Sequence, residues 1–313
     1  MKAGIACLII LFLASTAVGA ATRTIAVAYF NALRFGQGGS MCKDIELLTT
    51  ILGKYDVIAL GEVKRNTGGN EDGCAYGDEP LGHVDALVDA LNEGTSWSFY
   101  EPPWRYVASK EPVGRSAQSE EYYVVVYRED EVHAYNEGEI IPDNDDVFIR
   151  PPFAVTFGAW SFDFTLVVVH AIGPDNADEL EASTRELDDV YRGVRFGNLE
   201  ENDVILLGDF NVSSSRDQWW EELRAIDGMQ PLITENTSLG LNSLANPYDK
   251  IWINTNHTSH EHDMFCGSGV DRYWLSLFPD MTYEEFYQSY RRSISDHLPV
   301  WAEFRVDLPD DDT

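Results

Sequence analysis

Basic residues are scarce in this sequence. Its 22 lysines and arginines stand against 53 aspartates and glutamates, which gives a formal net charge of -31 at pH 7. Phosphate groups are bound mainly through lysine and arginine, so this balance excludes a generic binder of nucleic acids or anionic membranes. A polyanion would have to be bound by a local group of basic residues, because the negative net charge of the molecule repels it. We expect a surface adapted to salty surroundings, where screening weakens the self-repulsion.

Long apolar runs are absent after residue 20. At the N-terminus, Lys2 precedes apolar or small residues up to position 18, and the stretch ends in Val18-Gly19-Ala20. These features are typical of an export signal cut after Ala20. A retained anchor would need about 20 apolar residues to span a bilayer. We therefore expect a signal peptide at 1–20 and a secreted protein, extracellular or periplasmic, that does not bind membranes.

Cysteine is also scarce. Cys7 lies in the expected signal, and the remaining Cys42, Cys74 and Cys266 allow one disulfide whose pairing the sequence leaves open. Their spacing matches no zinc site. Repeats, low-complexity linkers and breaks in composition are absent as well. The chain after the signal therefore predicts one domain at 21–306, followed by an acidic tail at 307–313.

Strand and helix patterns alternate along this domain without a boundary. Short apolar and β-branched runs predict strands, and apolar residues at helical spacing predict helices. Such interleaving predicts one α/β domain in which two packed sheets carry outer helices. The expected strands are 24–29, 55–60, 122–127, 153–157, 162–169, 204–207, 249–254 and 298–306, with a hairpin partner for 122–127 at 131–135, and the expected helices are 44–52, 83–92 and 179–191.

The most informative stretch runs from Val204 to Asn211, an apolar strand that ends in Gly-Asp-Phe-Asn. Gly208 lets the backbone turn where Asp209 and Asn211 emerge. A carboxylate and a carboxamide spaced two apart can point into one cavity and hold a hard cation, a water or a phosphate oxygen. The alternative is an Asx-turn, in which Asp209 bonds its own backbone.

Polar residues follow several other expected strands in the same way. Taken singly, Glu62 could be a surface acid and His170 a buried histidine with a satisfied ring. Their repetition at the same topological place favours a site built from several strand ends. The residues are Asn31, Glu62, His170, Asp209 with Asn211, Asp249 and Ser295-Asp296-His297.

These residue types suit the hydrolysis of a phosphodiester. The reaction needs a base for the water, an acid for the leaving oxygen and positive charge at the phosphate. A histidine oriented by a carboxylate can act as acid or base near neutral pH, and we expect His170 and His297 to share the two roles, in an order left open. Glu62 and Asp296 can hold Mg²⁺, which also reverses the repulsion between an acidic site and a polyanion.

At these residues the chain resembles the endonuclease/exonuclease/phosphatase superfamily, and within it the deoxyribonuclease I branch. The resemblance runs from about residue 24 to residue 304. It implies a four-layered α/β sandwich of two packed, mixed and mainly antiparallel sheets flanked by helices. The superfamily motifs are Asn31, Gly61-Glu62-Val63, Gly208-Asp209-Phe210-Asn211 and Ser295-Asp296-His297, and the branch motifs are Lys110 to Arg115, Glu121 to Arg128, Arg150-Pro151-Pro152 and Tyr248 to Ile251.

The resemblance also implies an activity, the metal-dependent hydrolysis of DNA with Mg²⁺ or Mn²⁺. By position, Glu121 would pair with His170 and Asp249 with His297 as catalytic dyads, together with Asp209. The metal and the scissile phosphate would be held by Asn31, Glu62, Asp209, Asn211 and Asp296, the substrate would contact Asn211, Arg150, Arg115, Lys64 and Arg34, and a structural Ca²⁺ would lie at Asp143, Asp145 and Asp146 unless these form a solvated loop.

The chain departs from the family at two places. The segments that a disulfide joins in the family, here 212–215 and 244–247, contain no cysteine, and a bond between Cys42 and Cys74 could substitute in part. Ser119 stands where the family has an aromatic that packs on the DNA sugar.

Three functions remain. The first is a secreted, salt-tolerant, metal-dependent DNA endonuclease with little sequence preference, monomeric and without an obligate protein partner. The second is a sphingomyelinase-like phosphodiesterase that acts on a phospholipid, for which Trp219-Trp220 or the segment 278–290 would have to face a membrane. The third is a DNA-binding or toxin-like module without catalysis, which the presence of every catalytic residue type disfavours.

Overall fold

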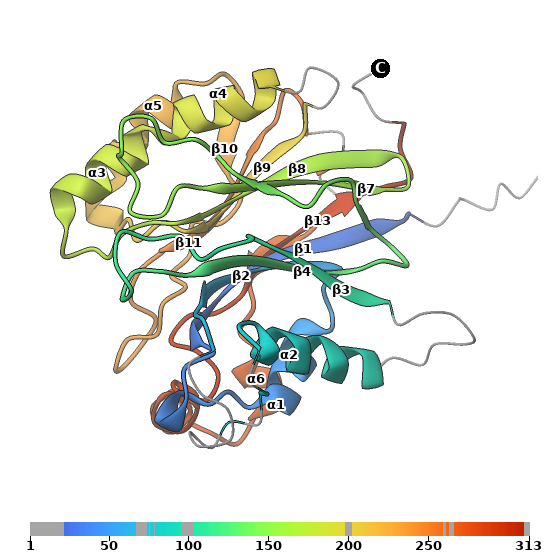
Figure 1. The fold of residues 1–313 in the computed structure, drawn as a ribbon, viewed down its shortest axis with the longest axis vertical. Helices are drawn as coiled ribbons and strands as arrows, with labels where there is room; N and C mark the ends of the chain where they lie inside the picture. The colour runs from blue at the N-terminus through green and yellow to red at the C-terminus, as the bar shows by residue number, and fades with distance from the viewer. Residues whose placement is uncertain are drawn as a thin grey trace, which may run out of the picture.

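The computed structural model describes residues 22–66, 74, 76–77, 79–94, 103–197, 202–258, 261–262 and 266–309. The expected signal peptide and the last residues of the acidic tail lie outside these ranges. Two mixed sheets lie face to face between layers of helices, so the predicted four-layered α/β sandwich is confirmed (Figure 1).

The two sheets share a mixed design. The first has six strands in the order β12-β13-β1-β2-β4-β3, and the second has seven in the order β10-β11-β9-β8-β7-β5, with β6 paired to β7. The pairs β1/β2 and β8/β9 are parallel, and the other pairs are antiparallel. The strands are β1 (Thr24–Phe35), β2 (Val57–Val63), β3 (Trp104–Ala108), β4 (Tyr122–Arg128), β5 (His133–Ala134), β6 (Glu139–Ile140), β7 (Phe153–Ala159), β8 (Phe162–His170), β9 (Val204–Asp209), β10 (Met229–Pro231), β11 (Asp249–Asn254), β12 (Ser268–Val270) and β13 (Val300–Arg305).

Three buried layers hold the sandwich together. In β4, Val125 faces the other sheet while Val124 and Val126 face the helices, so the strand is apolar on both sides. Helices α1, α2, α6 and α7 cover the first sheet, and α3, α4 and α5 cover the second (Figure 1). Their bounds are α1 (Ile45–Leu52), α2 (Gly82–Glu93), α3 (Ala177–Arg185), α4 (Leu187–Gly197), α5 (Glu221–Arg224), α6 (Trp274–Leu277) and α7 (Tyr283–Tyr290), and the short 3₁₀ helices are η1 (Gly39–Met41) and η3 (Ser214–Trp220).

Two local predictions are wrong. Residues 131–135 do not form a hairpin with β4, because a turn closed by the Val132 N–H on the Arg128 carbonyl (2.8 Å) carries the chain into the other sheet, where β5 pairs with β7. β4 instead pairs antiparallel with β2 on one side and, on the other, with β3, a strand that the pattern did not predict. The single helix expected at 179–191 is divided at Glu186 into α3 and α4.

The aromatic segments considered for membrane contact are largely packed inside the protein. Trp219 and Trp220 are buried. In the 278–290 segment, Phe286 of α7 is buried and its ring stacks on Trp274, with centroids 5.6 Å apart. No helix among the described residues is long and apolar enough to cross a membrane.

A disulfide joins Cys42 to Cys74, as the sequence allowed, and Cys266 is not part of one. Next to it, the Lys43 backbone N–H donates to the Tyr76 hydroxyl at 2.6 Å, and the Lys43 ammonium donates to the Arg292 carbonyl at 2.9 Å. The disulfide therefore fastens the segment before α1 to Cys74, and the adjacent Lys43 fastens it to the segment that leads into Asp296 and His297.

Candidate active site

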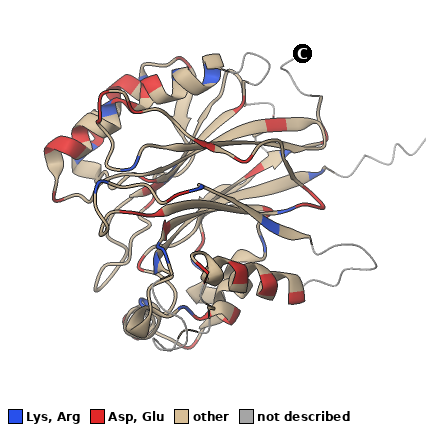
Figure 2. Cartoon of the chain, in the orientation of Figure 1, with Lys and Arg blue, Asp and Glu red and all other residues tan. Residues whose placement is uncertain are grey.

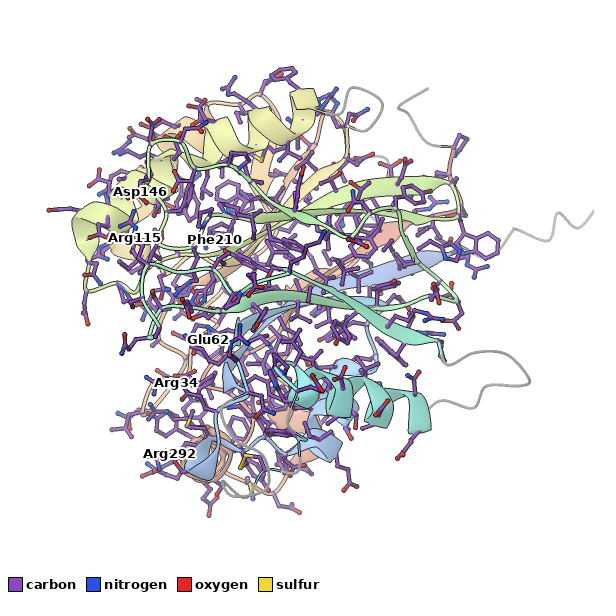
Figure 3. All side chains as sticks on the ribbon, in the orientation of Figure 1. Arg34, Glu62, Arg115, Asp146, Phe210 and Arg292 are labelled. Carbon is purple, nitrogen blue, oxygen red and sulfur yellow. A yellow bond between two sulfur atoms is a disulfide. The ribbon has the colours of Figure 1, made fainter. Side chains whose placement is uncertain are left out.

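The two parallel strand pairs bring their carboxyl ends to one edge of the sandwich. Asn31 lies in β1 and Glu62 in β2, while His170 and Asp209 close β8 and β9 in direct register. β11 runs antiparallel to β9, so its first residue, Asp249, lies opposite Asp209. In Figure 3 this edge is on the left, where Glu62 and Phe210 are labelled. The sheet topology thus gathers residues that are up to 218 positions apart, from Asn31 to Asp249.

Two glycines make this close gathering possible. A Cβ on Gly208 would lie 1.9 Å from the Val169 carbonyl oxygen, so only glycine fits between β8 and β9. A Cβ on Gly61 would lie 2.0 Å from the Tyr29 hydroxyl. The neighbouring Glu62 (φ 56°) and Asn211 (φ 54°) have left-handed backbones. Such strain in residues other than glycine is typical of functional sites.

Asn31 connects the two sheets at the floor of the site. It is fully buried, and its amide donates to Glu62 Oε1 (3.2 Å) and to Asp209 Oδ2 (3.0 Å). Its side-chain oxygen accepts from the Leu33 backbone N–H at 2.9 Å. Because all of these partners orient one carboxamide, Asn31 fixes the separation of the two carboxylates.

The first histidine–carboxylate dyad is held by cations. His170 Nδ1 lies 2.5 Å from Glu121 Oε2, and both side chains are buried. The other carboxylate oxygen accepts from Lys64 Nζ at 3.0 Å and lies 3.3 Å from Arg150 Nη1. Burial raises the pKa of Glu121, but His170, Arg150 and Lys64 outweigh it and hold that pKa well below its usual value. Glu121 is therefore an ionised anchor for the imidazole.

The second dyad is held by a hydroxyl. His297 Nδ1 lies 2.7 Å from Asp249 Oδ2, and Thr237 Oγ1 donates to the same oxygen at 2.5 Å. Burial lowers the pKa of His297, but the charges of Asp249 and Asp209 outweigh it and place that pKa well above its usual value. Thr237 was not predicted, because it lies in an irregular segment without a repeating pattern.

Asp209 lies between the two dyads. His170 Nε2 and His297 Nε2 are each 3.8 Å from the same atom, Asp209 Oδ2. A cavity of about 500 Å³ opens at this point. A reacting group placed there meets two imidazoles that can move a proton from opposite sides. The predicted residues that line the cavity are Arg34, Glu62, Lys64, Glu121, Arg150, His170, Asp209, Asn211 and His297.

Glu62 and Asp296 provide the donor set that fits a hard divalent cation. Burial raises the pKa of Asp296, and the negative charge of Glu62 raises it further, although His297 acts in the opposite direction. Asp296 Oδ1 is buried, and no described residue bonds it. A cation would supply the missing partner and offset the repulsion.

A second group of possible ligands is formed by Asp209, Asp249 and His297, whose ligand atoms lie within 4.8 Å of one another. His297 Nδ1 and Thr237 Oγ1 already bond to Asp249 Oδ2. A cation bound by all three residues would compete with these hydrogen bonds of the dyad. The carboxylates of Glu62 and Asp296 therefore suit a hard cation better.

The four cations predicted to bind substrate differ in their surroundings. The Arg150 guanidinium donates to the carbonyls of Ser119, His170 and Ala171 at 2.9 to 3.1 Å, so it supports the first dyad as well as lining the cavity. Lys64 is held in a similar way by the carbonyls of Gln118 and Glu120. Arg34 is exposed at the opening. Arg115 does not line the cavity, since it pairs with Asp146 and Glu179.

The acidic loop predicted to hold Ca²⁺ does not line the active-site cavity. The carboxylate of Asp143 accepts from the backbone N–H groups of Val147 (3.0 Å) and Phe148 (2.8 Å), while Asp146 faces Arg115 at 3.3 Å. Asp143 and Asp145 line a separate cavity of about 640 Å³. A Ca²⁺ site there stays a prediction.

Comparisons with known proteins agree with this geometry. Residues 28–297 match the model of the Endonuclease/Exonuclease/phosphatase family. The chain is 28% identical to human Deoxyribonuclease-1-like 2 over 90% of this chain and 92% of that protein. It is also 28% identical to a Deoxyribonuclease of Thioalkalivibrio sp. (strain K90mix), over 85% of this chain and 68% of that protein. Among solved structures, the human Nocturnin catalytic domain shares the fold, with a TM-score of 0.56 and 15% identity over 90% of this chain and 94% of that one.

Proposed function

Because the chain belongs to the endonuclease/exonuclease/phosphatase family, we propose that it is a metal-dependent endonuclease that hydrolyses the phosphodiester bonds of DNA with little sequence preference. The observation that carries this proposal is the pair of dyads whose Nε2 atoms lie 3.8 Å from one oxygen of Asp209. Two imidazoles on either side of one point suit a reaction that takes a proton from water and gives one to a leaving oxygen.

The charges around the dyads support a division of the two roles. Asp249 and Asp209 keep the proton on His297, which suits the acid that protonates the leaving oxygen. The negative charge of Glu121 is shared with Lys64 and Arg150, which leaves His170 as the base that accepts a proton from the attacking water. Mg²⁺ or Mn²⁺ at Glu62 and Asp296 would supply positive charge to the phosphate.

DNA is favoured over a phospholipid by two observations. Of the aromatic residues that membrane binding would need, Trp219, Trp220 and Phe286 are buried, and Phe278, Tyr283, Tyr287 and Tyr290 are partly buried against the core. The two relatives that share 28% identity with this chain are both named as deoxyribonucleases.

Secretion and salt tolerance complete the proposal. The apolar residues after Lys2 and the small residues before Ala21 support export. The net charge of -31 supports function in salty surroundings, where screening reduces the repulsion between the enzyme and DNA. We further propose that the enzyme is a monomer without an obligate partner.

The test is cleavage of supercoiled plasmid by the purified protein with Mg²⁺, with Mn²⁺, with Mg²⁺ plus Ca²⁺, and with chelator, from low to molar salt. We expect metal-dependent nicking that persists at high salt. His170→Ala and His297→Ala should each lower the rate by about 10²- to 10⁴-fold. His133→Ala is the matched control, because His133 is exposed and lies outside the site. Near-normal rates in both site variants would refute the mechanism, and cleavage of sphingomyelin but not of plasmid would refute the substrate.

A further inference from the structure

The arginines of this acidic protein are not distributed evenly with respect to carboxylates. Acids crowd the outer helices α2, α3 and α4 (Figure 2), and most arginines have a carboxylate oxygen within 4.0 Å. With 53 acidic residues against 22 basic ones, an arginine without an acidic partner is unusual. Within the described residues, the arginines without one are Arg34, Arg195, Arg216, Arg291 and Arg292.

Two of these arginines lie near the opening of the active site. Arg34 follows Asn31 in β1, lines the cavity and is exposed. Arg216 is half-exposed and lies in η3, where its guanidinium donates to the Pro174 carbonyl at 3.0 Å and lies over the Trp219 ring. Pro174 follows Gly173, which lines the same cavity from the loop after β8. Among the described residues, neither guanidinium has a carboxylate oxygen within 4.0 Å.

Arg291 and Arg292 lie at the end of α7, a few residues before Asp296, and both are exposed. Four residues span at most about 14 Å, so Arg292 lies within that distance of Asp296, measured between their Cα atoms. Its carbonyl is held by Lys43 at 2.9 Å, and the Ser293 carbonyl accepts from the Asp44 N–H at 2.9 Å. In Figure 3, Arg34 and Arg292 are labelled on the same side of the molecule as Glu62. The backbone is fixed here, while the Arg292 guanidinium is left for an outside partner.

We infer that Arg34, Arg216, Arg291 and Arg292 form an arginine rim that binds the phosphates on both sides of the scissile bond, so that the substrate is an extended nucleic-acid backbone rather than a small phosphodiester. This inference rests on the proposed function. Guanidinium groups suit phosphate because they donate in a planar fork. Arginines paired with carboxylates elsewhere are already neutralised, so the guanidinium groups of the rim are those left to attract phosphate.

Arg195 does not belong to the rim. It lies in α4, next to Tyr191 on the outer face of the second sheet. Arg115 is excluded for a different reason, since Asp146 and Glu179 compete for its guanidinium.

The test compares Arg291→Gln/Arg292→Gln with Arg272→Gln. Arg272 precedes α6, is similarly accessible and pairs with Glu235 at 3.5 Å, so its variant controls for loss of charge without loss of the rim. Three measurements are made on each protein: the KM for duplex DNA against salt, binding of a labelled duplex by fluorescence anisotropy with the metal removed, and the rate on bis(4-nitrophenyl) phosphate. Melting curves establish that the variants are folded, and Arg292→Gln alone serves if the double variant is not.

We expect the double variant to raise the KM for DNA by about tenfold at low salt and to weaken duplex binding in the same proportion. The slope of log affinity against log salt should fall by about 2, because each phosphate contact contributes about 0.9. The rate on the small phosphodiester should stay within about twofold of the wild type, since that substrate does not reach the rim.

Three results would overturn the inference. They are an unchanged KM and salt slope in the double variant, an equal loss in Arg272→Gln, or an equal loss on the small substrate. In each case plasmid cleavage by the wild-type protein would leave the proposed function intact. Failure of the wild-type protein to cleave or bind DNA under any condition would instead refute the proposed function and, with it, the rim.

Discussion

Both dyads pair a histidine with a carboxylate, but the surroundings of the two carboxylates differ. In both, an imidazole Nδ1 faces a buried carboxylate, and both Nε2 atoms lie 3.8 Å from Asp209 Oδ2. Glu121 is bonded by Lys64 and contacted by Arg150, whereas Asp249 receives the neutral hydroxyl of Thr237. The comparison shows that a histidine–carboxylate pair can be adapted to two tasks. The cations around Glu121 fix that carboxylate as an anchor. Asp249 is bonded by a neutral hydroxyl instead, so its charge raises the proton affinity of His297.

The strongest way to break this comparison is to neutralise each carboxylate in turn. Glu121→Gln leaves the half-buried Lys64 and the buried Arg150 without their carboxylate, and an arginine cannot release its proton. We expect a loss of about 3–5 kcal/mol in the free energy of unfolding. Asp249→Asn leaves His297 with Asp209 still 3.8 Å away, and that imidazole can deprotonate, so the loss should be smaller. Urea denaturation of both variants at pH 7 measures the difference.

The pH dependence gives the same pair of variants a second readout. The pKa of His297 is raised in the folded protein. Its contribution to stability is therefore fully present below the unfolded pKa of about 6.5 and is lost as the pH rises through the raised value. Asp249→Asn should weaken this dependence, because only Asp209 and Asp296 then raise the pKa of His297, and Glu121→Gln should retain it. Equal stability losses with the same pH profile in both variants would show that the two dyads do not differ as described.

A third buried histidine supplies the reference state for the comparison, a histidine without any carboxylate. His83 packs against the rings of Phe35 (4.6 Å) and Tyr76 (6.0 Å), and both ring nitrogens lack a partner among the described residues. Burial lowers the pKa of His83 to about 3. As the pH falls from about 6.5 towards 3, His83 takes up a proton in the unfolded chain but stays neutral in the folded protein. The free energy of unfolding therefore falls by about 1.4 kcal/mol per pH unit.

Substitution of His83 by phenylalanine tests whether burial without a carboxylate keeps a histidine neutral. The acid limb of the free energy of unfolding, measured by urea denaturation from pH 7 to pH 4, should become flatter in His83→Phe. His133→Phe is the control, since His133 is exposed. An unchanged slope would mean that burial alone does not keep a histidine neutral here, and the raised pKa of His297 could then not be ascribed to its carboxylates.

Three residues of the dyads, His170, Asp249 and His297, could be predicted because they lie at the ends of expected strands, whereas Glu121 and the pairing within each dyad came from the resemblance to the family. His170 ends an apolar strand and Asp249 begins one, and parallel pairing of β8 with β9 then places His170 beside Asp209. The supporting groups were not accessible in this way. Arg150 could be identified as a cation, but that its guanidinium bonds three carbonyls depends on the folded loops.

Strand pairing shows the same limit. The residues of β5 have strand character, but which strand they pair with is decided by tertiary packing rather than by local propensity. Val132 is buried between the sheets, and its burial carries β5 across to β7. The local pattern thus predicted the elements of the sandwich better than their neighbours.

The smallest change that tests the difference between the dyads is removal of the Thr237 hydroxyl, which bonds Asp249 in the way that Lys64 bonds Glu121. Thr237→Val keeps the shape of the buried side chain but deletes the Oγ1 that donates to Asp249 Oδ2 and accepts from the Asp249 N–H at 3.1 Å. We expect a loss of about 1–2 kcal/mol in the free energy of unfolding, because a buried N–H is left without a partner. With one fewer donor on the carboxylate, Asp249 should attract the His297 proton more strongly, so the pKa of His297 measured by NMR should rise further. Thr237→Ser restores the hydroxyl and should restore both quantities. A fall in the pKa of His297 in Thr237→Val would mean that the hydroxyl orients Asp249 towards the imidazole, and the second dyad would then depend on fixed geometry in the same way as the first.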